Sequence, residues 1–439
     1  MDKTVPSVAG LPWAFTDKPV TPWGGLRLVN EMLLRMRFRE ALNESGLPSP
    51  GSNRGYEPAM MFESFLVCVW IGGTRFSHTA HVRFDSALRQ IFGWREVAEV
   101  STFTRFFRRF KREEVDWVFG NLGRWFWEHM SPRTITLDFD SSVITRYGDQ
   151  EGTAIGYNRQ RQGNPSHQPL FAFVADLRMV LHAWLRPGDV GNSNGVCEFF
   201  SEALALLAGR HKVGLARADA GFYDGDFIDQ LESKGIRYII VARKTKALQA
   251  TYEGLKRWLA LDDEFAVAEF GYQCATWQKK RRYIVVRQKL PRKTGELLLD
   301  APGYKYRVMV TDLELAPAEV WRLYNGRCDS ENRIAELKNE FGINGFCLDA
   351  FYATEAAFRA SMLAYNLMSL FRQAILQSPT AVRLPTMRFE CFALGAWIGR
   401  KARKKLLRLS VPPQRRRWFE GLFAETLAFS PPWLRPAES

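Results

Sequence analysis

The sequence has no long apolar segment, no paired-cysteine motif and few histidines. Its longest apolar run, Phe65 to Ile71, is far shorter than the ~20 residues that a membrane-spanning helix needs. The N-terminal residues also lack the pattern of a signal peptide. The cysteines are dispersed without a C-x-x-C motif, which argues against zinc and fits reduced thiols in a cytosol. We interpret the close pair His78 and His81 as structural, because Cys or acidic companions are missing. These absences predict a cytoplasmic protein with no membrane partner.

The composition is that of a globular, basic protein. The chain has 439 residues, enough for several domains with substantial cores, and 46% of them are hydrophobic. The net charge is +14, from 61 Lys and Arg against 47 Asp and Glu. This excess favours a polyanionic partner, either nucleic acid or an acidic membrane surface. The aromatic residues add flat surfaces on which bases can stack, although most large aromatics in any protein are core.

Residues 1–130 have the periodicity of a mostly helical domain. We expect helices at 25–47 and 56–71, and a third from Ser101 to Arg112 with an apolar stripe of phenylalanines. The cationic side chains of this third helix would be free to face DNA, as in the second helix of a helix-turn-helix unit. The alternative is a basic amphipathic helix packed on its own domain. The cations in question are Arg105, Arg108, Arg109, Lys111 and Arg112.

From residue 131 the pattern changes to alternating apolar and polar residues, which is typical of strands. Three meandering strands followed by alternating helix and strand is the order of a ribonuclease-H-like α/β domain. The predicted strands are 134–144, 170–176, 179–185, 212–219 and 236–242, and the predicted helices are 195–209 and 224–234.

The rest of the chain divides into an insertion, a second segment of the α/β domain and a basic tail. Residues 243–312 read as a β-rich insertion, with strand-like segments near 265, 282 and 306. A helix begins at Pro317, and a long helix follows at 354–376. The segment from Val382 to the C-terminus carries twelve Lys or Arg against four Glu, so it is either a solvated face or a footprint for a phosphate backbone. The predicted domains are therefore 1–130, 131–242 with 313–380, 243–312, and 381–439.

Acidic residues stand out on two of the strands. Asp138 and Asp140 point to one face of the first strand, and two carboxylates placed this way repel unless a cation lies between them or one is protonated. Asp219 ends the fourth strand, and Gly221 permits a tight turn after it. Reactive groups collect at the carboxyl ends of strands in open α/β sheets. A lone Asp in that place can also be a simple turn or cap residue.

The helix that begins at Pro317 carries the most informative motif. Tyr324, Arg327, Glu331 and Lys338 follow the spacing Y-x2-R-x3-E-x6-K. On one continuous helix, these side chains point within an arc of roughly 60°. One carboxylate flanked by two cations and a phenol could hold a metal ion beside a phosphodiester. The alternative is a solvated helix face laced with salt bridges.

This spacing resembles the signature of one large group of bacterial insertion-sequence transposases, whose final Glu completes an Asp-Asp-Glu metal triad. Asp140-Ser-Ser is similar to the Asp-Ser-Thr that follows the first strand in this family, and Asp219-Ala-Gly-Phe to its Asp-Ala/Ser-Gly-Phe/Tyr. The segment 156–170 resembles a subgroup whose first strand reads Asp-x-Asp-Ser. The resemblance covers about residues 130–400.

The resemblance implies a DNA transposase that binds terminal inverted repeats and performs metal-dependent cleavage and strand transfer in a cut-and-paste reaction. Asp140, Asp219 and Glu331 would be the catalytic and metal-binding residues, with Asp138 as a less certain ligand. Carboxylates without His or Cys select Mg²⁺ or Mn²⁺, and two such ions ~3.5–4 Å apart support phosphoryl transfer. The expected DNA-contacting residues are Tyr324, Arg327, Lys338, Arg105, Arg108, Arg109, Arg159 and Arg161.

The expected partners are double-stranded DNA, both transposon end and target, and a second copy of the chain. The homodimer rests mostly on the resemblance, with indirect support from an apolar face on helix 354–376 that packing under the catalytic domain would explain equally well. The expected location is the bacterial cytoplasm, in association with the nucleoid. The residues of that face are Phe358, Met362, Tyr365, Leu367 and Leu370.

Two other functions remain to be weighed. A catalytically inactive, transposase-derived DNA-binding or regulatory protein would share the fold and the charge, but such a copy would usually have lost one of the acids. A glycoside hydrolase with paired carboxylates fits neither the basic charge nor Arg327 and Lys338.

Overall fold

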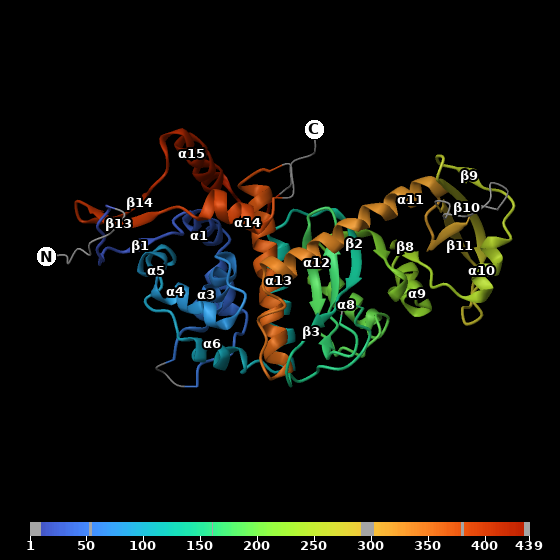
Figure 1. Ribbon diagram of the computed structural model, residues 1–439, viewed down its shortest axis with the longest axis horizontal. Coiled ribbons are helices and arrows are strands. Elements are labelled where there is room, and N and C mark those ends of the chain that lie inside the picture. The colour runs from blue at the N-terminus through green and yellow to red at the C-terminus, as the bar shows by residue number, and fades with distance from the viewer. Residues whose placement is uncertain (1–9, 52–54, 160, 291–302, 379–381, 434–439) are drawn as a thin grey trace.

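The computed structural model describes residues 10–51, 55–159, 161–290, 303–378 and 382–433 (Figure 1). Helices from both ends of the chain lie at one end of the molecule, a β-sheet occupies the middle, and the β-rich insertion lies at the other end. The long helix α13, Phe351–Ala374, stands between the helical end and the sheet.

The N-terminal region is helical, as the sequence predicts. The expected helix at 25–47 is two helices, because the chain turns at Met36 and Arg37, and Arg37 has a left-handed φ of 53°. Its helices are α1 Leu26–Arg35, α2 Phe38–Glu44, α3 Pro58–Trp70, α4 Thr79–Phe84, α5 Ser86–Phe92, α6 Val100–Phe107 and α7 Arg112–Glu128.

The helix expected from Ser101 to Arg112 is wrong in its length. α6 ends at Phe107, and the chain is already extended at Lys111 before α7 begins. The turn is imposed by the core, since the phenylalanine stripe packs inward and Phe110, beyond the helix, is also buried. The apolar stripe of α6 is thus buried, as both interpretations of this helix expect. The buried phenylalanines are Phe103, Phe106, Phe107 and Phe110.

The middle of the molecule is the predicted ribonuclease-H-like arrangement. β2 pairs antiparallel with β5 and parallel with β7, and β7 pairs parallel with β8. Three meandering strands are thus followed by strands that alternate with helices, in the spatial order β6-β5-β2-β7-β8. The elements are β2 Thr134–Ser141, β5 Leu170–Val174, β6 Met179–Trp184, α8 Val196–Leu206, β7 Lys212–Ala218, α9 Gly225–Ser233 and β8 Arg237–Val241.

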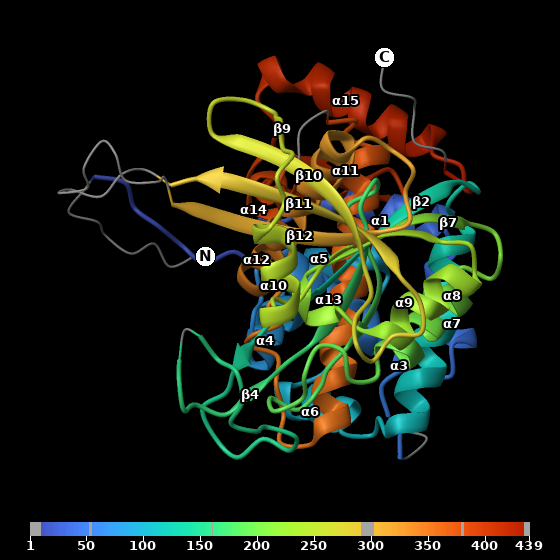
Figure 2. The same cartoon turned by 90° about the vertical axis from the view of Figure 1, so that its right-hand side faces the viewer.

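The insertion is β-rich as expected, but it does not form a sheet of its own. Its last strand, β12, pairs antiparallel with β8, so the insertion extends the central sheet to nine strands. Figure 2 shows β10, β11 and β12 side by side at this end of the molecule. The elements are α10 Lys246–Glu253, β9 Leu259–Ala260, β10 Phe265–Tyr272, β11 Arg281–Lys289 and β12 Tyr304–Thr311.

Helix α13 is buried along almost its whole length. It packs against β6 on one side and against α3 and α7 on the other, and the face considered for a dimer interface is covered within the chain. That face therefore gives no support to a homodimer. Among the described residues, no helix is both long and apolar enough to cross a membrane.

The C-terminal region folds together with the N-terminal one. β1, near the start of the chain, pairs antiparallel with β13, which pairs with β14. A domain boundary at 130 and another at 381 thus separate segments that share one sheet. The elements are β1 Val20–Thr21, α14 Leu384–Met387, β13 Ala396–Lys401, β14 Lys404–Leu409 and α15 Pro413–Ala428, and the short strands β3 Ile144–Thr145 and β4 Ser166–His167 form a separate pair.

Candidate active site

Two of the predicted acids lie at the carboxyl ends of two neighbouring strands in the central sheet. Asp140 lies near the carboxyl end of β2, and Asp219 follows the last residue of β7, the parallel neighbour of β2. Burial raises the pKa of the Asp219 carboxyl, the Arg327 guanidinium opposes this rise, and the charge of Asp140 adds to it. The two carboxylates and one cation therefore form a single electrostatic unit.

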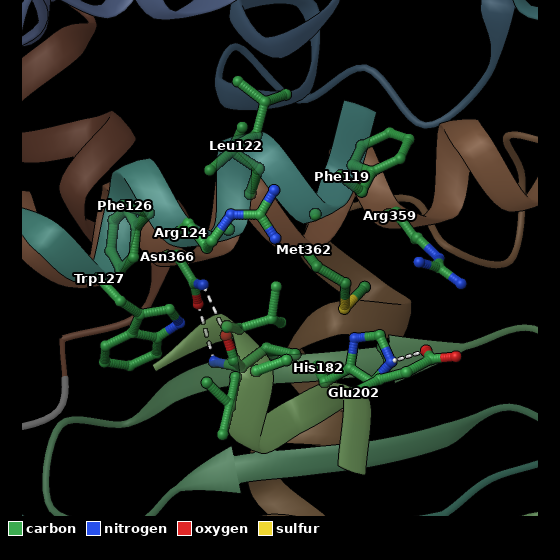
Figure 3. A pocket seen from close by; sticks show the side chains of 18 of the residues that line it. Phe119, Leu122, Arg124, Phe126, Trp127, His182, Glu202, Arg359, Met362 and Asn366 are labelled. Atoms are coloured by element: carbon green, nitrogen blue, oxygen red, sulfur yellow. Dashed lines mark hydrogen bonds and ion pairs between the residues drawn. The ribbon is translucent and has the colours of Figure 1, made fainter. Parts of the chain in front are cut away.

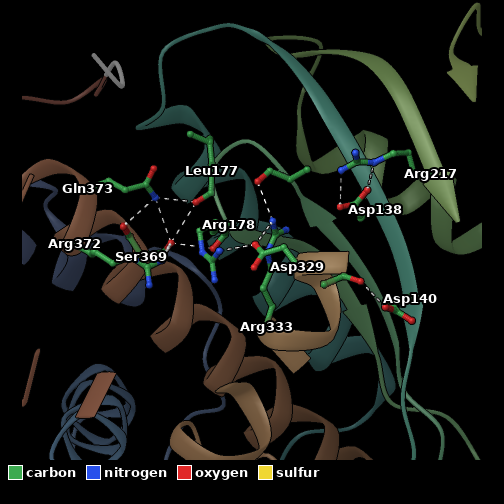
Figure 4. Close-up of polar contacts among 12 residues, drawn as sticks. Asp138, Asp140, Leu177, Arg178, Arg217, Asp329, Arg333, Ser369, Arg372 and Gln373 are labelled. Atoms are coloured by element: carbon green, nitrogen blue, oxygen red, sulfur yellow. Dashed lines mark hydrogen bonds and ion pairs between the residues drawn. The ribbon is translucent and has the colours of Figure 1, made fainter. Parts of the chain in front are cut away.

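Asp140 is almost completely buried and fully bonded. Its Oδ2 accepts a hydrogen bond from the Ser330 hydroxyl at 2.7 Å, marked by the dashed line at Asp140 in Figure 4. The same oxygen lies 3.1 Å from Nη2 of Arg327. Its Oδ1 accepts from the backbone N–H of Ser141 at 2.9 Å. Arg327 also donates to the carbonyl of Phe139 at 2.9 Å. Arg327 thus neutralises the charge of the Asp140 carboxylate and reduces its repulsion with Asp219.

Asp219 caps a short turn rather than a long helix. Its Oδ1 accepts from the backbone N–H of Gly221 at 2.8 Å, which fixes the carboxylate at the end of β7. Gly221 does not have a positive φ in this turn. A side chain there would collide with Asn192, so the glycine serves close packing.

Asp138 is occupied by a different partner. It has no exposed surface, and its two oxygens accept from Nε and Nη2 of Arg217 at 2.7 and 3.0 Å (Figure 4). Burial raises the pKa of the Asp138 carboxyl and the ion pair with Arg217 opposes that rise. Arg217 also donates to the carbonyl of Leu323 at 2.5 Å. This pair joins two strands to the helix above them.

The helix expected to run on from Pro317 is interrupted. It consists of α11 Pro317–Asn325, a 3₁₀ turn at Gly326–Cys328 and α12 Asp329–Glu340. Asn and Gly have low helix propensity, and a side chain at Gly326 would lie 2.8 Å from Nη1 of Arg217. The tighter turn lets the chain approach the buried pair. The angles calculated for one continuous α-helix therefore do not apply across this turn.

The four residues of the motif consequently lie in different surroundings. Tyr324 is buried in the apolar cluster beneath the insertion strands. Arg327 contacts Asp140. Lys338 donates to the carbonyl of Val143 at 2.8 Å, and burial lowers the pKa of its ammonium group. Glu331 is exposed, one residue after Ser330. The structure thus brings Asp140, Asp219 and Arg327 together and leaves Glu331 at the surface beside them.

Only part of a metal site is assembled in this arrangement. Asp140 and Asp219 provide the hard oxygen ligands that Mg²⁺ and Mn²⁺ prefer. In the described part of the chain, however, no group of three acidic, His or Cys side chains is close enough to hold an ion. The two aspartates fit a divalent metal, and a third carboxylate would have to turn toward them.

The residues that fix α12 beside Asp140 were not predicted. Arg178 and Arg333 both pair with Asp329, at 2.5 and 2.9 Å, and Arg333 also donates to the carbonyl of Ala175 (Figure 4). Together with Ser330 they hold the first turn of α12 against the sheet. Arg217 had a detectable signal, because two acids on one strand face require a cation nearby. Ser330 gave no such signal in the sequence, because it was not among the residues grouped on one face of the expected helix.

The predicted DNA-contacting arginines other than Arg327 lie away from these acids. Arg105 bonds within α6, Arg108 pairs with the exposed Asp349 at 3.0 Å, and Arg109 donates to the carbonyl of Ser49. Arg159 and Arg161 are exposed in the loop between β3 and β4. None of them contacts Asp140 or Asp219.

A cavity of ≈ 260 Å³ lies apart from these acids, between α7, α8, α13 and β6 (Figure 3). Its polar wall includes His182, whose Nε2 is 2.8 Å from Oε2 of Glu202, and Arg359. Burial lowers the pKa of His182 to about 4, so the ring is neutral near pH 7.

Comparisons with known proteins give the family of this chain. No curated protein matches the chain. Among solved structures, the chain is similar to the piggyBac transposase in a cryo-EM synaptic complex with hairpin DNA, with 9% identity, a TM-score of 0.48 and coverage of 83% of this chain and 78% of that one. The profile of the family "Transposase DDE domain group 1" matches residues 11–426, nearly the whole chain. The protein therefore belongs to the family of DDE-domain transposases.

Proposed function

We propose that this protein is the transposase of a bacterial insertion sequence, which binds terminal inverted repeats and cuts and joins DNA. The observation that carries the proposal is the pairing of Asp140 and Asp219 around Arg327 at the carboxyl ends of two parallel strands. Family membership makes phosphoryl transfer on DNA the natural use of such a pair. A protein with this task acts where chromosomal DNA lies, in the cytoplasm at the nucleoid.

Asp140 and Asp219 would hold Mg²⁺ or Mn²⁺, and Glu331 would complete the set by turning inward from the surface. Two bound ions supply Lewis acids that activate a water or 3′-hydroxyl and stabilise the leaving oxygen. Arg327 and Lys338 would neutralise the scissile phosphate. Arg327 already neutralises Asp140, so its guanidinium would have to share that carboxylate with any bound cation.

The test is cleavage of a duplex that carries the terminal repeat and its flanking DNA. Asp140→Asn, Asp219→Asn and Glu331→Gln should each abolish cleavage while binding of the same duplex persists. Glu340→Gln, at the other end of α12, is the matched control and should leave cleavage intact. Full cleavage by the Asp140 variant would refute the assignment, and full cleavage by the Glu331 variant alone would show that another group completes the site.

One observation favours a second candidate function. Glu331 is exposed and no complete metal-binding group is assembled among the described residues, as expected of a DNA-binding or regulatory protein that no longer cuts. Such a protein would bind the repeat duplex with and without Mg²⁺ and never nick it. Nicking by the wild-type protein that disappears in the Asp219 variant would exclude this candidate.

We further propose that the active form is a homodimer, because joining two DNA ends requires both to be held together. Glu331→Ala chains can be mixed with chains that are deficient in DNA binding. Recovered cleavage would show that one subunit binds an end while its partner supplies the cut. An inactive mixture, with a protein–DNA complex that sediments as one chain, would exclude the dimer.

A further inference from the structure

The hairpin of β13 and β14 carries a charge arrangement that weakens its own fold. In its register Arg400 faces Lys405, and Lys401 faces Lys404. Like charges directly opposite each other on a sheet are destabilising. Within the described residues, no carboxylate pairs with any of these four cations. The hairpin therefore carries cations that its own stability does not require.

The outer face of the hairpin combines these cations with one aromatic platform. Trp397 faces Arg408 across the two strands, and its ring lies over Gly399, where a side chain would collide with it. The Arg408 guanidinium stands 5.3 Å from the ring centroid and the Lys18 ammonium 5.8 Å. Because side chains alternate along a strand, Lys401 and its partner across the hairpin share this outer face.

The inner face borders a groove with the same sign of charge. The groove has a volume of ≈ 590 Å³ and lies between the hairpin, α1 and α5. Arg95 and Lys405 line it together with Arg27, and no carboxylate of the described residues does. Arg27 is neutralised by Glu31 at 2.7 Å. Lys405 donates to the amide oxygen of Gln90 at 2.8 Å and keeps its charge uncompensated.

We propose that this hairpin binds the sugar–phosphate backbone of duplex DNA, at a surface separate from Asp140 and Asp219. Exposed cations without internal partners are the groups that replace counterions along a duplex. Single-stranded DNA would need several aromatic faces for stacking, and here the Arg408 and Lys18 cations already lie over the ring of Trp397. The inference rests on the proposed function only in taking DNA as the molecule on which the protein acts.

The test compares two triple variants that each lose two Lys and one Arg. The hairpin variant is K401Q/K404Q/R408Q. The matched control is K234Q/K256Q/R257Q, which removes exposed cations from the residue after α9 and from the insertion, outside the hairpin. Binding to a 30-bp duplex of arbitrary sequence is measured across salt concentrations. Loss of three phosphate contacts should lower the slope of log K against log salt by about 2–3 units, whereas the control should change it by less than about one.

Several outcomes separate this inference from its rivals. Equal slopes for the hairpin variant and the wild type, or equal losses in both triple variants, would overturn it. Binding of the wild type to phosphatidylserine vesicles that the hairpin variant loses, with DNA binding unchanged, would assign the surface to a membrane instead. The charge-preserving variant K401R/K404R/R408K should keep the wild-type slope, and a loss there would also contradict phosphate binding.

The inference and the proposed function can fail independently. A wild-type protein that binds duplex through the hairpin but never nicks it would refute the transposase and support the hairpin. A protein that nicks DNA with an unchanged salt slope in the hairpin variant would do the reverse. A melting temperature for K401Q/K404Q equal to or above that of the wild type would exclude a merely structural role for these lysines.

Discussion

The cations at the candidate active site and those on the β13–β14 hairpin differ in surroundings rather than in type. Arg217, Arg327 and Arg333 are buried, and each bonds a carboxylate. Lys401 and Lys404 are exposed, and within the described residues no acid pairs with them. A buried charge requires a partner inside the protein because water cannot solvate it. An exposed charge has no such requirement, so it remains available for an anion from outside.

The largest effect should follow from breaking a buried pair. Arg217→Met leaves Asp138 charged, buried and unpaired, and should lower the free energy of unfolding by about 3–5 kcal/mol. Urea denaturation followed by circular dichroism measures this loss. The double variant D138L/R217M removes both charges and should recover most of the stability. A single variant as stable as the wild type would mean that the pair is dispensable and the comparison between regions fails.

The buried, neutral imidazole of His182 should make the free energy of unfolding depend strongly on pH. His182 has a pKa of about 4 in the folded protein against about 6.5 when unfolded, so the unfolded chain binds more protons between these values. Its contribution is complete above about pH 6.5 and is lost as pH falls toward 4, up to roughly 3 kcal/mol. His182→Gln should flatten this part of the stability–pH curve. An unchanged curve would show that the pKa of His182 is the same in the folded and unfolded states.

The close approach at Gly326 should be sensitive to one methyl group. Gly326→Ala places a Cβ 2.8 Å from Nη1 of Arg217, a side chain that Asp138 and Leu323 hold in place. The crowding should cost about 1–3 kcal/mol. Gly421→Ala is the matched control, because this α15 glycine has open space around it and should gain about 0.5–1 kcal/mol. Stabilisation by both changes would show that Arg217 moves freely.

The smallest effect is expected at the hairpin. K401Q/K404Q should change the free energy of unfolding by no more than about 0.5 kcal/mol, with a small gain at low salt because like charges no longer face each other. The gain should vanish at high salt, where exposed charges are screened. Thermal melts at two salt concentrations test this. A loss of several kcal/mol would place these lysines with the buried cations and erase the contrast between the regions.

Much of the fold could be predicted because local pattern controls it. The strands from 134 to 241 and the helices between them follow apolar alternation and helical spacing, which reflect which side chains must be buried. The site was less predictable. The helical angles that grouped Tyr324 with Glu331 assumed one continuous α-helix. A 3₁₀ turn lies between these two residues, where Gly326 approaches Arg217. That contact joins residues more than a hundred positions apart, so no local pattern could reveal it.

The sequence by itself indicated that Asp140 lies on the first strand of the sheet and that Asp219 ends the fourth, because alternation along the chain is a local property. It also determined the excess of positive charge. Only the tertiary structure decided which cation meets which acid, giving Arg217 to Asp138 and Arg327 to Asp140. Only it decided that Lys401 and Lys404 of the β13–β14 hairpin are exposed and have no acidic partner among the described residues. The physical reason is that pairing depends on distances across the fold, whereas burial and alternation depend on neighbours along the chain.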